Sequence, residues 1–186
     1  SQHCLADDLL RFLGSLDADA ALILNGDVID RWHTALPPAH QEVLDTLVRE
    51  SHRRRVVWIR GNHDDTFTLE NSGHIEFCRS FRMRSLIAAH GDYFDTRHPS
   101  YALFVRAFRW LHDTRIRLGA ESVHVAFYAK RFPAFYRMLL DTVRTNAVEF
   151  AKENGCTAVT CGHTHYSEDA EIEGTRYINT GSWTET

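Results

Sequence analysis

The sequence predicts an α/β fold, and three observations lead to this prediction. Amphipathic helical segments alternate with short apolar strands along the chain. Four of the strands end in glycine and polar residues. The 186 residues are enough for one domain with a sizeable core. Because open α/β sheets bind ligands beyond the ends of their strands, we expect these four strand ends to converge on one site.

The N-terminal half predicts two helix–strand units. In the first helix, apolar residues recur at helical spacing: Leu5, Leu9, Phe12, Leu13 and Leu16. The stretch DADAALILNGD, 17–27, then passes through a short strand into a glycine–acid turn. A second amphipathic helix is marked by Val43, Leu44, Leu47 and Val48. It is followed by RRRVVWIRGNHDD, 53–65, a β-branched strand that ends in polar residues.

The C-terminal half predicts three further strands and a helical insertion. SLIAAHGD, 85–92, and TAVTCGHTH, 157–165, are short apolar runs that end in glycine and histidine, and GTRYINTGSW, 174–183, is a closing strand. Between them, Phe104, Phe108 and Leu111 lie at helical spacing. We therefore predict a core of residues 1–97 and 155–186, and a helical cap insertion of two or three helices at 98–154.

Composition excludes several classes of protein. The net charge of -4 and the pI near 6.3 argue against general nucleic-acid binding. Cys4, Cys78, Cys156 and Cys161 form no C-x-x-C pair, which favours a reducing compartment. No apolar run approaches the roughly 20 residues that span a bilayer, and no basic region with an apolar core opens the chain. We expect a cytoplasmic protein.

Five strand-end side chains offer ligand atoms for a metal: Asp27, Asn62, His90, His163 and His165. Carboxylate, amide and imidazole groups suit Mn²⁺, Fe²⁺ or Zn²⁺, and nearby thiolates are absent from the set. Each motif alone is also compatible with a turn or a histidine at a strand end. Their conjunction at four strand ends favours a metal site, and a set this rich usually holds more than one ion. The chemistry expected of two adjacent ions is phosphoester hydrolysis.

The motifs GD, GNHD, HGD and GHTH, in this order from Asn25 to about Trp183, resemble the calcineurin-like metallophosphoesterases. The resemblance implies a two-sheet β sandwich flanked by helices. It also implies that Asp27 bridges two metals, that Asn62, His90 and His163 hold one of them, and that His165 holds the other. His63 would face the scissile phosphate as a catalytic residue, and Asp64 would orient it.

A narrower resemblance concerns GDVIDRW, HGDYFD and YINTGSW, which are similar to the UDP-2,3-diacylglucosamine pyrophosphatase group of lipid A synthesis. It implies hydrolysis of UDP-2,3-diacylglucosamine to UMP and diacylglucosamine 1-phosphate, with two divalent ions, most often Mn²⁺. The substrate would be a nucleotide-linked glycolipid, reached at the inner-membrane surface by a peripheral protein. Neither nucleic acid nor an obligate protein partner is expected.

The insertion is net positive, with nine Arg and Lys against three Asp and Glu between Arg97 and Arg144. Its aromatic residues could fill a helical core while its arginines are solvated, or the segment could cover the site and bind acyl chains and phosphates. A basic amphipathic surface also favours anionic membranes. On the second reading, the substrate-binding residues are Arg97, Arg106, Arg109, Arg131, Phe104 and Phe108.

One departure from the family pattern concerns the start of the chain. The family opens with an Asp-x-His motif that supplies two ligands to the ion bound by His165, and SQH at 1–3 is not that motif. We expect the first segment to have been omitted; otherwise one metal position has lost two ligands. Asp7 and Asp8 fit the solvated face of a helix. The alternatives left open are a phosphodiesterase for another nucleotide and a metal-poor scaffold without catalysis.

Overall fold

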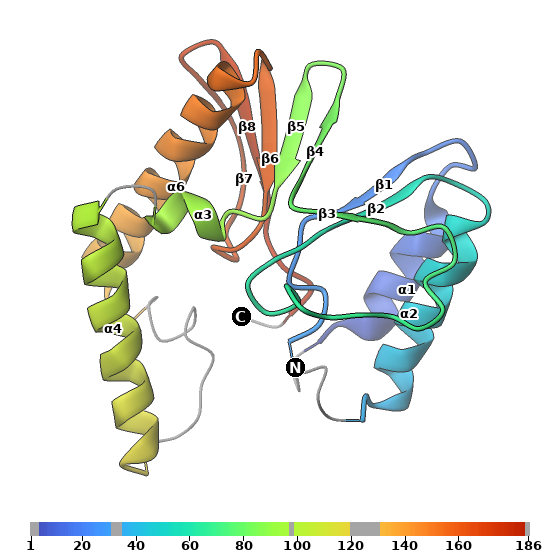
Figure 1. Cartoon of the computed structure of the whole chain (residues 1–186), viewed down its shortest axis with the longest axis horizontal. Helices are drawn as coiled ribbons and strands as arrows, with labels where there is room; N and C mark the ends of the chain where they lie inside the picture. The colour runs from blue at the N-terminus through green and yellow to red at the C-terminus, as the bar shows by residue number, and fades with distance from the viewer. Residues whose placement is uncertain (1–3, 31–34, 97–98, 120–130, 185–186) are drawn as a thin grey trace.

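A computed structural model of the chain describes residues 4–30, 35–96, 99–119 and 131–184. Two β-sheets lie side by side, and helices flank each of them (Figure 1). One sheet has three parallel strands in the order β1 (Leu22–Leu24), β2 (Val56–Ile59) and β3 (Glu76–Cys78). The predicted α/β fold with two sheets between helices is therefore confirmed.

The second sheet has five strands in the order β4, β5, β6, β8, β7. Their bounds are β4 (Ser80–Met83), β5 (Leu86–Ala89), β6 (Ala158–Cys161), β7 (Ser167–Ile172) and β8 (Thr175–Thr180). The three central strands β5, β6 and β8 are parallel, and β4 and β7 pair antiparallel at the edges. The carboxyl ends of β5 and β6 therefore lie at the same edge, where the HGD and GHTH motifs follow them.

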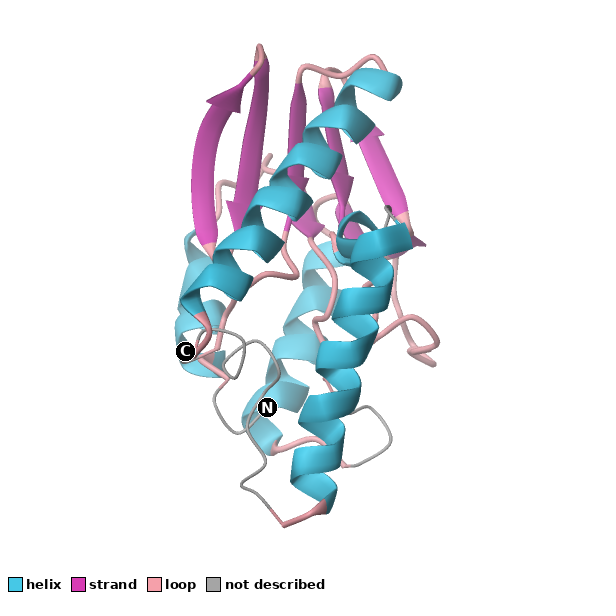
Figure 2. Cartoon of the chain, turned by 90° about the vertical axis from the view of Figure 1, so that its left-hand side faces the viewer, coloured by secondary structure: helices cyan, strands magenta, loops and turns pink. Residues whose placement is uncertain are grey.

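Helices cover the two sheets on different sides (Figures 1 and 2). Helices α1 (Ala6–Ser15) and α2 (Pro38–Ser51) lie beside the three-stranded sheet. Helix α2 starts at a proline, whose fixed φ suits the first turn. On the five-stranded side lie α3 (Asp92–Thr96), α4 (Pro99–Arg117) and α6 (Pro133–Glu153).

Apolar residues form one cluster between the sheets and one beneath each helical layer. The first helical layer packs Leu13, Val43, Leu44 and Leu47 against Val56 and Trp58. The second packs Val143, Ala147 and Val148 against Val159 and Tyr177. The cluster between the sheets combines residues of both: Val57, Ile59 and Ala88, with Ile23, Cys78 and Phe81 partly buried against them. Strand β2 is buried along its whole length, which explains its continuous apolar run VVWI.

Sequence patterns did not predict three of the strands. Strands β3 and β4 are separated only by Arg79, at which the chain passes from one sheet to the other. Strand β7 has the sequence SEDAEI, and its residues alternate between exposed and half-buried at the edge of the sheet. Short strands and polar edge strands lack the apolar pattern on which prediction relies.

Helix α6 lies within the segment predicted as a cap, but its C-terminal half is part of the core. Val143, Ala147, Val148 and Ala151 are buried against the five-stranded sheet. Helix α4 extends past the strand ends instead (Figure 2). Several of its large apolar side chains are exposed. The described part of the insertion therefore includes a helix integrated into the core, α6, and a helix that projects from it, α4.

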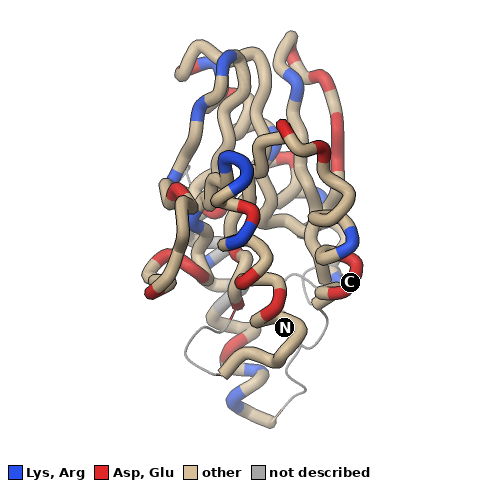
Figure 3. Tube along the Cα trace, turned by 90° about the vertical axis from the view of Figure 1, so that its right-hand side faces the viewer, with Lys and Arg blue, Asp and Glu red and all other residues tan. Residues whose placement is uncertain are grey.

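Several surface charges of the described residues are paired locally. Lys and Arg are interspersed with Asp and Glu along the face shown in Figure 3, and exposed ion pairs include Arg49 with Glu42 and Arg55 with Glu76. Such pairs contribute little to stability, about 0–1 kcal/mol each. Within the described part of the chain, no helix is both long enough and apolar enough to cross a membrane.

Candidate metal centre

The strand-end loops of the two sheets meet at one place. Asn25 follows β1, and its side-chain amide donates to the Thr160 hydroxyl at 2.9 Å and to the carbonyl of Cys161 at 3.3 Å. It thereby ties the three-stranded sheet to β6 in the other sheet. Within the five-stranded sheet, the N–H of Gly162 donates to the carbonyl of His90 at 2.9 Å. These bonds hold the GD, HGD and GHTH loops together.

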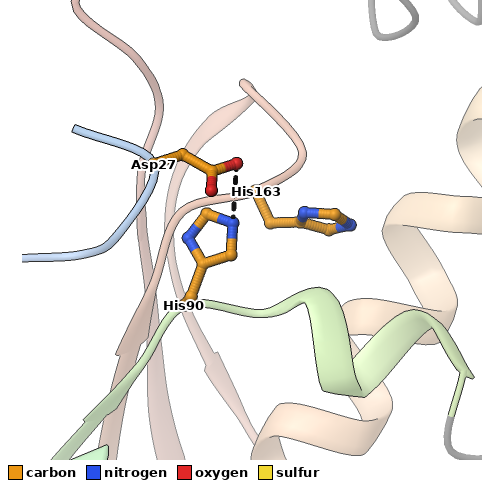
Figure 4. Close-up of side chains that lie close together, drawn as sticks. All are labelled: Asp27, His90 and His163. Carbon is orange, nitrogen blue, oxygen red and sulfur yellow. Dashed lines mark ion pairs between the residues drawn. The ribbon is translucent and has the colours of Figure 1, made fainter. Parts of the chain in front are cut away.

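Three of the predicted ligands form a compact triad: Asp27, His90 and His163 (Figure 4). One ligand atom from each residue lies within 4.8 Å of the other two. The imidazole rings of His90 and His163 meet edge to face, with centroids 5.2 Å apart. A carboxylate oxygen and two imidazole nitrogens are a donor set suited to Zn²⁺, Fe²⁺ or Mn²⁺.

The tautomer of neutral His90 follows from its hydrogen bond. Its Nδ1 lies 2.6 Å from the carbonyl oxygen of Asn25, which can only accept, so Nδ1 carries a proton. Its buried Nε2 lies 3.0 Å from Oδ2 of Asp27, yet it has no hydrogen bond of suitable geometry among the described residues. A nitrogen lone pair facing a carboxylate oxygen requires a cation or a proton between them. The side chains therefore fit a metal ion.

In neutral His163 the proton lies on Nε2, whereas in neutral His90 it lies on Nδ1. Its Nε2 lies 2.9 Å from Oδ2 of Asp95, at the C-terminal part of α3. An ionised carboxylate only accepts, so Nε2 carries the proton and Nδ1 is left with the lone pair. A carboxylate that holds a ligating histidine in this way orients the ring and increases its basicity. Asp95 lies in the HGDYFD motif but was not among the predicted site residues.

Asp27 lies in a tight space that requires glycine at two neighbouring positions. A Cβ on Gly61 would lie 2.2 Å from Oδ1 of Asp27, and one on Gly26 would lie 2.5 Å from Nδ1 of His90. Burial by itself raises the pKa of Asp27, but the contacts with His90 and the N–H and charge of His63 outweigh burial and lower the pKa to about 2. Asp27 is therefore a carboxylate at neutral pH, as a metal ligand must be.

His63 pairs with Asp30. Its Nδ1 lies 2.8 Å from Oδ1 of Asp30, and its Nε2 lies 3.9 Å from Oδ2 of Asp27. The hydrogen bond to Asp30 raises the pKa of His63; burial opposes this rise, and the negative charge of Asp27 adds to it. The protonated imidazole is thus favoured, and its Nε2 side is directed toward the triad.

The orienting role expected of Asp64 falls to Asp30. Asp64 is fully buried at 0% exposure, and its carboxylate accepts hydrogen bonds from Gly61 N at 2.7 Å, Val28 N at 2.9 Å and Trp58 Nε1 at 2.9 Å. Through these three hydrogen bonds, the carboxylate holds the GNHD loop against β2 and against the loop after β1. Asp64 therefore anchors the loop, a correction to the expected pairing with His63.

Arg60 supports the same loop from its other end. Its Nη1 lies within hydrogen-bonding distance of the carbonyls of Asp64 at 3.1 Å, Asp65 at 2.8 Å and Phe67 at 2.9 Å. Its guanidinium lies over the ring of Phe77, 5.0 Å from the centroid. One guanidinium nitrogen thus faces three backbone acceptors and shares its two hydrogens among them, which ties this end of the loop to Arg60.

The other predicted site residues stay predictions. Asn62 is exposed in the loop after β2, and His165 is half-buried in the loop that also carries His163. Arg106 and Arg131 are exposed, in α4 and just before α6. Arg97 lies outside the described residues, and the side chains of Phe104, Phe108 and Arg109 on α4 are likewise outside the description.

Comparison with known proteins identifies one family. Residues 3–167 match the family model described as calcineurin-like phosphoesterase. No curated protein shows detectable sequence similarity to the chain.

Solved structures with a similar course of the chain include a single mutant of Vps29 from Entamoeba histolytica, which is 12% identical in sequence. Its alignment has a TM-score of 0.49 and covers 98% of this chain and 67% of that one. A predicted phosphoesterase from Streptococcus pneumoniae TIGR4 is 16% identical with a TM-score of 0.38, covering 96% of this chain and 64% of that one. Phosphopantetheinyl hydrolase from Mycobacterium tuberculosis is 14% identical with a TM-score of 0.46, and the alignment covers 92% of this chain and 84% of that one. The chain spans about two thirds of the length of the first two structures.

Proposed function

This chain belongs to the calcineurin-like phosphoesterase family, and we propose that it is a metal-dependent hydrolase of phosphoesters. The observation that carries the proposal is the triad of Asp27, His90 and His163, with its ligand atoms within 4.8 Å of one another. The buried Nε2 of His90 lies 3.0 Å from the carboxylate of Asp27, and a metal ion is one of the two species, a cation or a proton, that this contact accommodates.

A divalent ion bound there would supply Lewis-acid activation of water and stabilise the negative charge of the phosphate oxygens. Asp27, His90 and His163 would hold it. The protein's own proton donor is His63, whose imidazolium Asp30 favours. We propose that His63 donates its Nε2 proton to the leaving oxygen as the phosphorus–oxygen bond breaks, and that water returns the proton afterwards.

A second ion is part of the proposal. Asn62 would extend the ligand set of the first ion, Asp27 would bridge, and His165 would serve the second. The proposed ion is Mn²⁺, with Fe²⁺ and Zn²⁺ as further candidates. These donors are of the hard and borderline types that all three ions accept.

For the substrate, we propose a nucleotide-linked glycolipid such as UDP-2,3-diacylglucosamine, cleaved to UMP and diacylglucosamine 1-phosphate. Helix α4 and the turn after it support this choice, since they expose large apolar residues: Leu103, Trp110 and Leu111 on the helix and Leu118 in the turn. Exposed Arg106 on the same helix and Arg131 before α6 supply cations for phosphates. Contact with an anionic membrane surface is part of the same proposal.

The test measures UMP release from UDP-2,3-diacylglucosamine and hydrolysis of bis(p-nitrophenyl) phosphate, each with and without Mn²⁺. We expect metal-dependent turnover of both, which Asp27→Asn and His90→Ala abolish. His74→Ala is the matched control, since His74 is an exposed histidine in the loop before β3. Turnover of the simple diester alone would point to another nucleotide substrate. Absence of both metal binding and turnover would mean a scaffold and refute the proposal.

A further inference from the structure

The loop that carries His163 and His165 is under backbone strain. Both residues have positive φ angles, 62° and 56°, a conformation that side chains disfavour. Thr164 between them is buried, and its N–H donates to the carbonyl of Gly162 at 2.7 Å. Such a loop persists only where surrounding contacts outweigh the strain.

One set of contacts comes from the sheet. The side-chain amide of Asn179 in β8 is buried and donates to the carbonyl of Gly162 at 2.8 Å and to the hydroxyl of Thr164 at 3.1 Å. The Oδ1 of Asn179 accepts from the N–H of Gly181 at 3.0 Å, which fixes the orientation of the amide. Asn179 thus secures the loop from within the core.

A second contact comes from helix α6. The hydroxyl of Tyr136, in the first turns of the helix, donates to the carbonyl of Thr164 at 2.8 Å. That carbonyl belongs to the peptide group joining Thr164 to His165. Burial raises the pKa of Tyr136 to about 12, so the hydroxyl remains a donor throughout the neutral range.

The same helix also reaches the other side of His163. Asn146, buried in the middle of α6, donates to the carbonyl of Phe94 at 2.6 Å. Phe94 precedes Asp95, whose carboxylate accepts from Nε2 of His163 at 2.9 Å. Helix α6 is itself anchored, because Val143, Ala147 and Ala151 are buried against the five-stranded sheet. It therefore contacts the histidine loop directly and through α3.

We infer that Tyr136 is a positioning residue for metal binding, which makes helix α6 of the insertion a structural part of the metal centre. Its hydroxyl holds the Thr164 carbonyl, and thereby helps to keep His163 and His165 in their strained conformation, with His163 next to Asp27 and His90. The inference deepens the proposed function and rests on it for the presence of the metal. A consequence is that a change in the position of the N-terminal end of α6 alters the affinity of the site for a metal ion.

The test compares Tyr136→Phe with Thr142→Val. Thr142 lies on the same helix, and its hydroxyl donates to the carbonyl of Met138 within that helix at 2.9 Å, so this control removes a hydroxyl without touching the loop. Mn²⁺ binding to the metal-free proteins is titrated by electron paramagnetic resonance of the free ion. We expect Tyr136→Phe to bind Mn²⁺ about tenfold more weakly than the wild type, as for other supports of ligating residues. Thr142→Val should bind like the wild type.

Thermal unfolding of the metal-free variants separates positioning from general stability, and we expect the two variants to unfold at similar temperatures. If Tyr136→Phe does not fold, Tyr136→Leu takes its place in the same titration. Equal Mn²⁺ affinity of the Tyr136 variant and the wild type overturns the inference and leaves the proposed function standing. A wild type that binds no Mn²⁺ refutes the proposed function itself, and the inference with it.

Discussion

The Nδ1 of His63 lies 2.8 Å from Oδ1 of Asp30, although 33 residues separate them in the chain. Asp30 belongs to the loop after β1 and His63 to the loop after β2. Because β1 and β2 are neighbouring parallel strands, with Leu24 paired to Trp58, their following loops leave the sheet at the same edge. The pairing of the two side chains is thus a direct result of strand order.

Asp30→Asn should lower kcat about 100-fold while Mn²⁺ affinity stays close to that of the wild type. The amide removes the carboxylate that favours the protonated imidazole, and a positioned proton donor typically contributes about 10²–10⁴-fold in rate. The measurement is kcat and KM on bis(p-nitrophenyl) phosphate with Mn²⁺. Asp65→Asn is the control, since Asp65 is in the same loop as His63 and pairs with Arg79 at the surface. Unchanged kcat in Asp30→Asn would contradict the role of the pair.

Asp95→Asn should weaken Mn²⁺ binding about 10–100-fold, the typical effect of removing a hydrogen-bond partner from a ligating histidine. The buried carboxylate of Asp95 accepts from Nε2 of His163 at 2.9 Å, and an amide can present its donor group there instead. Calorimetric titration of the metal-free protein gives the affinity. Asp113→Asn on the exposed side of α4 is the control. Wild-type affinity in Asp95→Asn would show that His163 does not ligate through Nδ1.

Arg60→Ala should destabilise the protein by about 3 kcal/mol. The guanidinium lies at hydrogen-bonding distance from three carbonyls of the GNHD loop and over Phe77, and a hydrogen bond to a charged group contributes about 1.5–3 kcal/mol. Urea unfolding of the metal-free protein measures the free energy. The control is Arg53→Ala, because Arg53 is exposed at 72% and makes a surface pair with Glu50; its loss should cost less than about 1 kcal/mol. Equal effects of the two substitutions would rule out the support of the loop by Arg60.

Cys161 should make the protein less stable at alkaline pH. Burial raises the pKa of its thiol to about 12 from the ordinary 9.0. Between pH 9 and 12 the unfolded chain loses this proton while the folded protein keeps it, so the free energy of unfolding falls as pH rises; below pH 9 the thiol has no such effect.

The comparison of wild type with Cys161→Ser isolates this effect, because a serine hydroxyl does not titrate and all other groups are shared. Urea unfolding from pH 8 to 11 should show an additional fall of about 1.4 kcal/mol per pH unit in the wild type above pH 9. Parallel curves would mean that the Cys161 thiol ionises in the folded protein. The native protein should also leave Cys161 unmodified by iodoacetamide at pH 8, and unfolded protein should react.

The sequence determined the fold class and three residues of the candidate metal centre. Apolar periodicity identified β1, β2, β5, β6 and β8, because buried strands need continuous or alternating apolar residues. The polar residues that follow them identified Asp27, His90 and His163, because loops at the carboxyl edge of parallel strands come together. Both inferences depend on local patterns that each segment carries by itself.

Tertiary structure alone decided which side chains support these residues. Asp30, Asp95, Tyr136 and Asn179 act through contacts with residues far away in the chain, and no spacing or periodicity encodes such contacts. Asp64 shows the limit most clearly, because the family resemblance implied that it orients His63, whereas the backbone directs its carboxylate to Gly61, Val28 and Trp58. Neighbours in sequence diverge where a loop turns, and the packing of sheets and helices determines which groups each side chain meets.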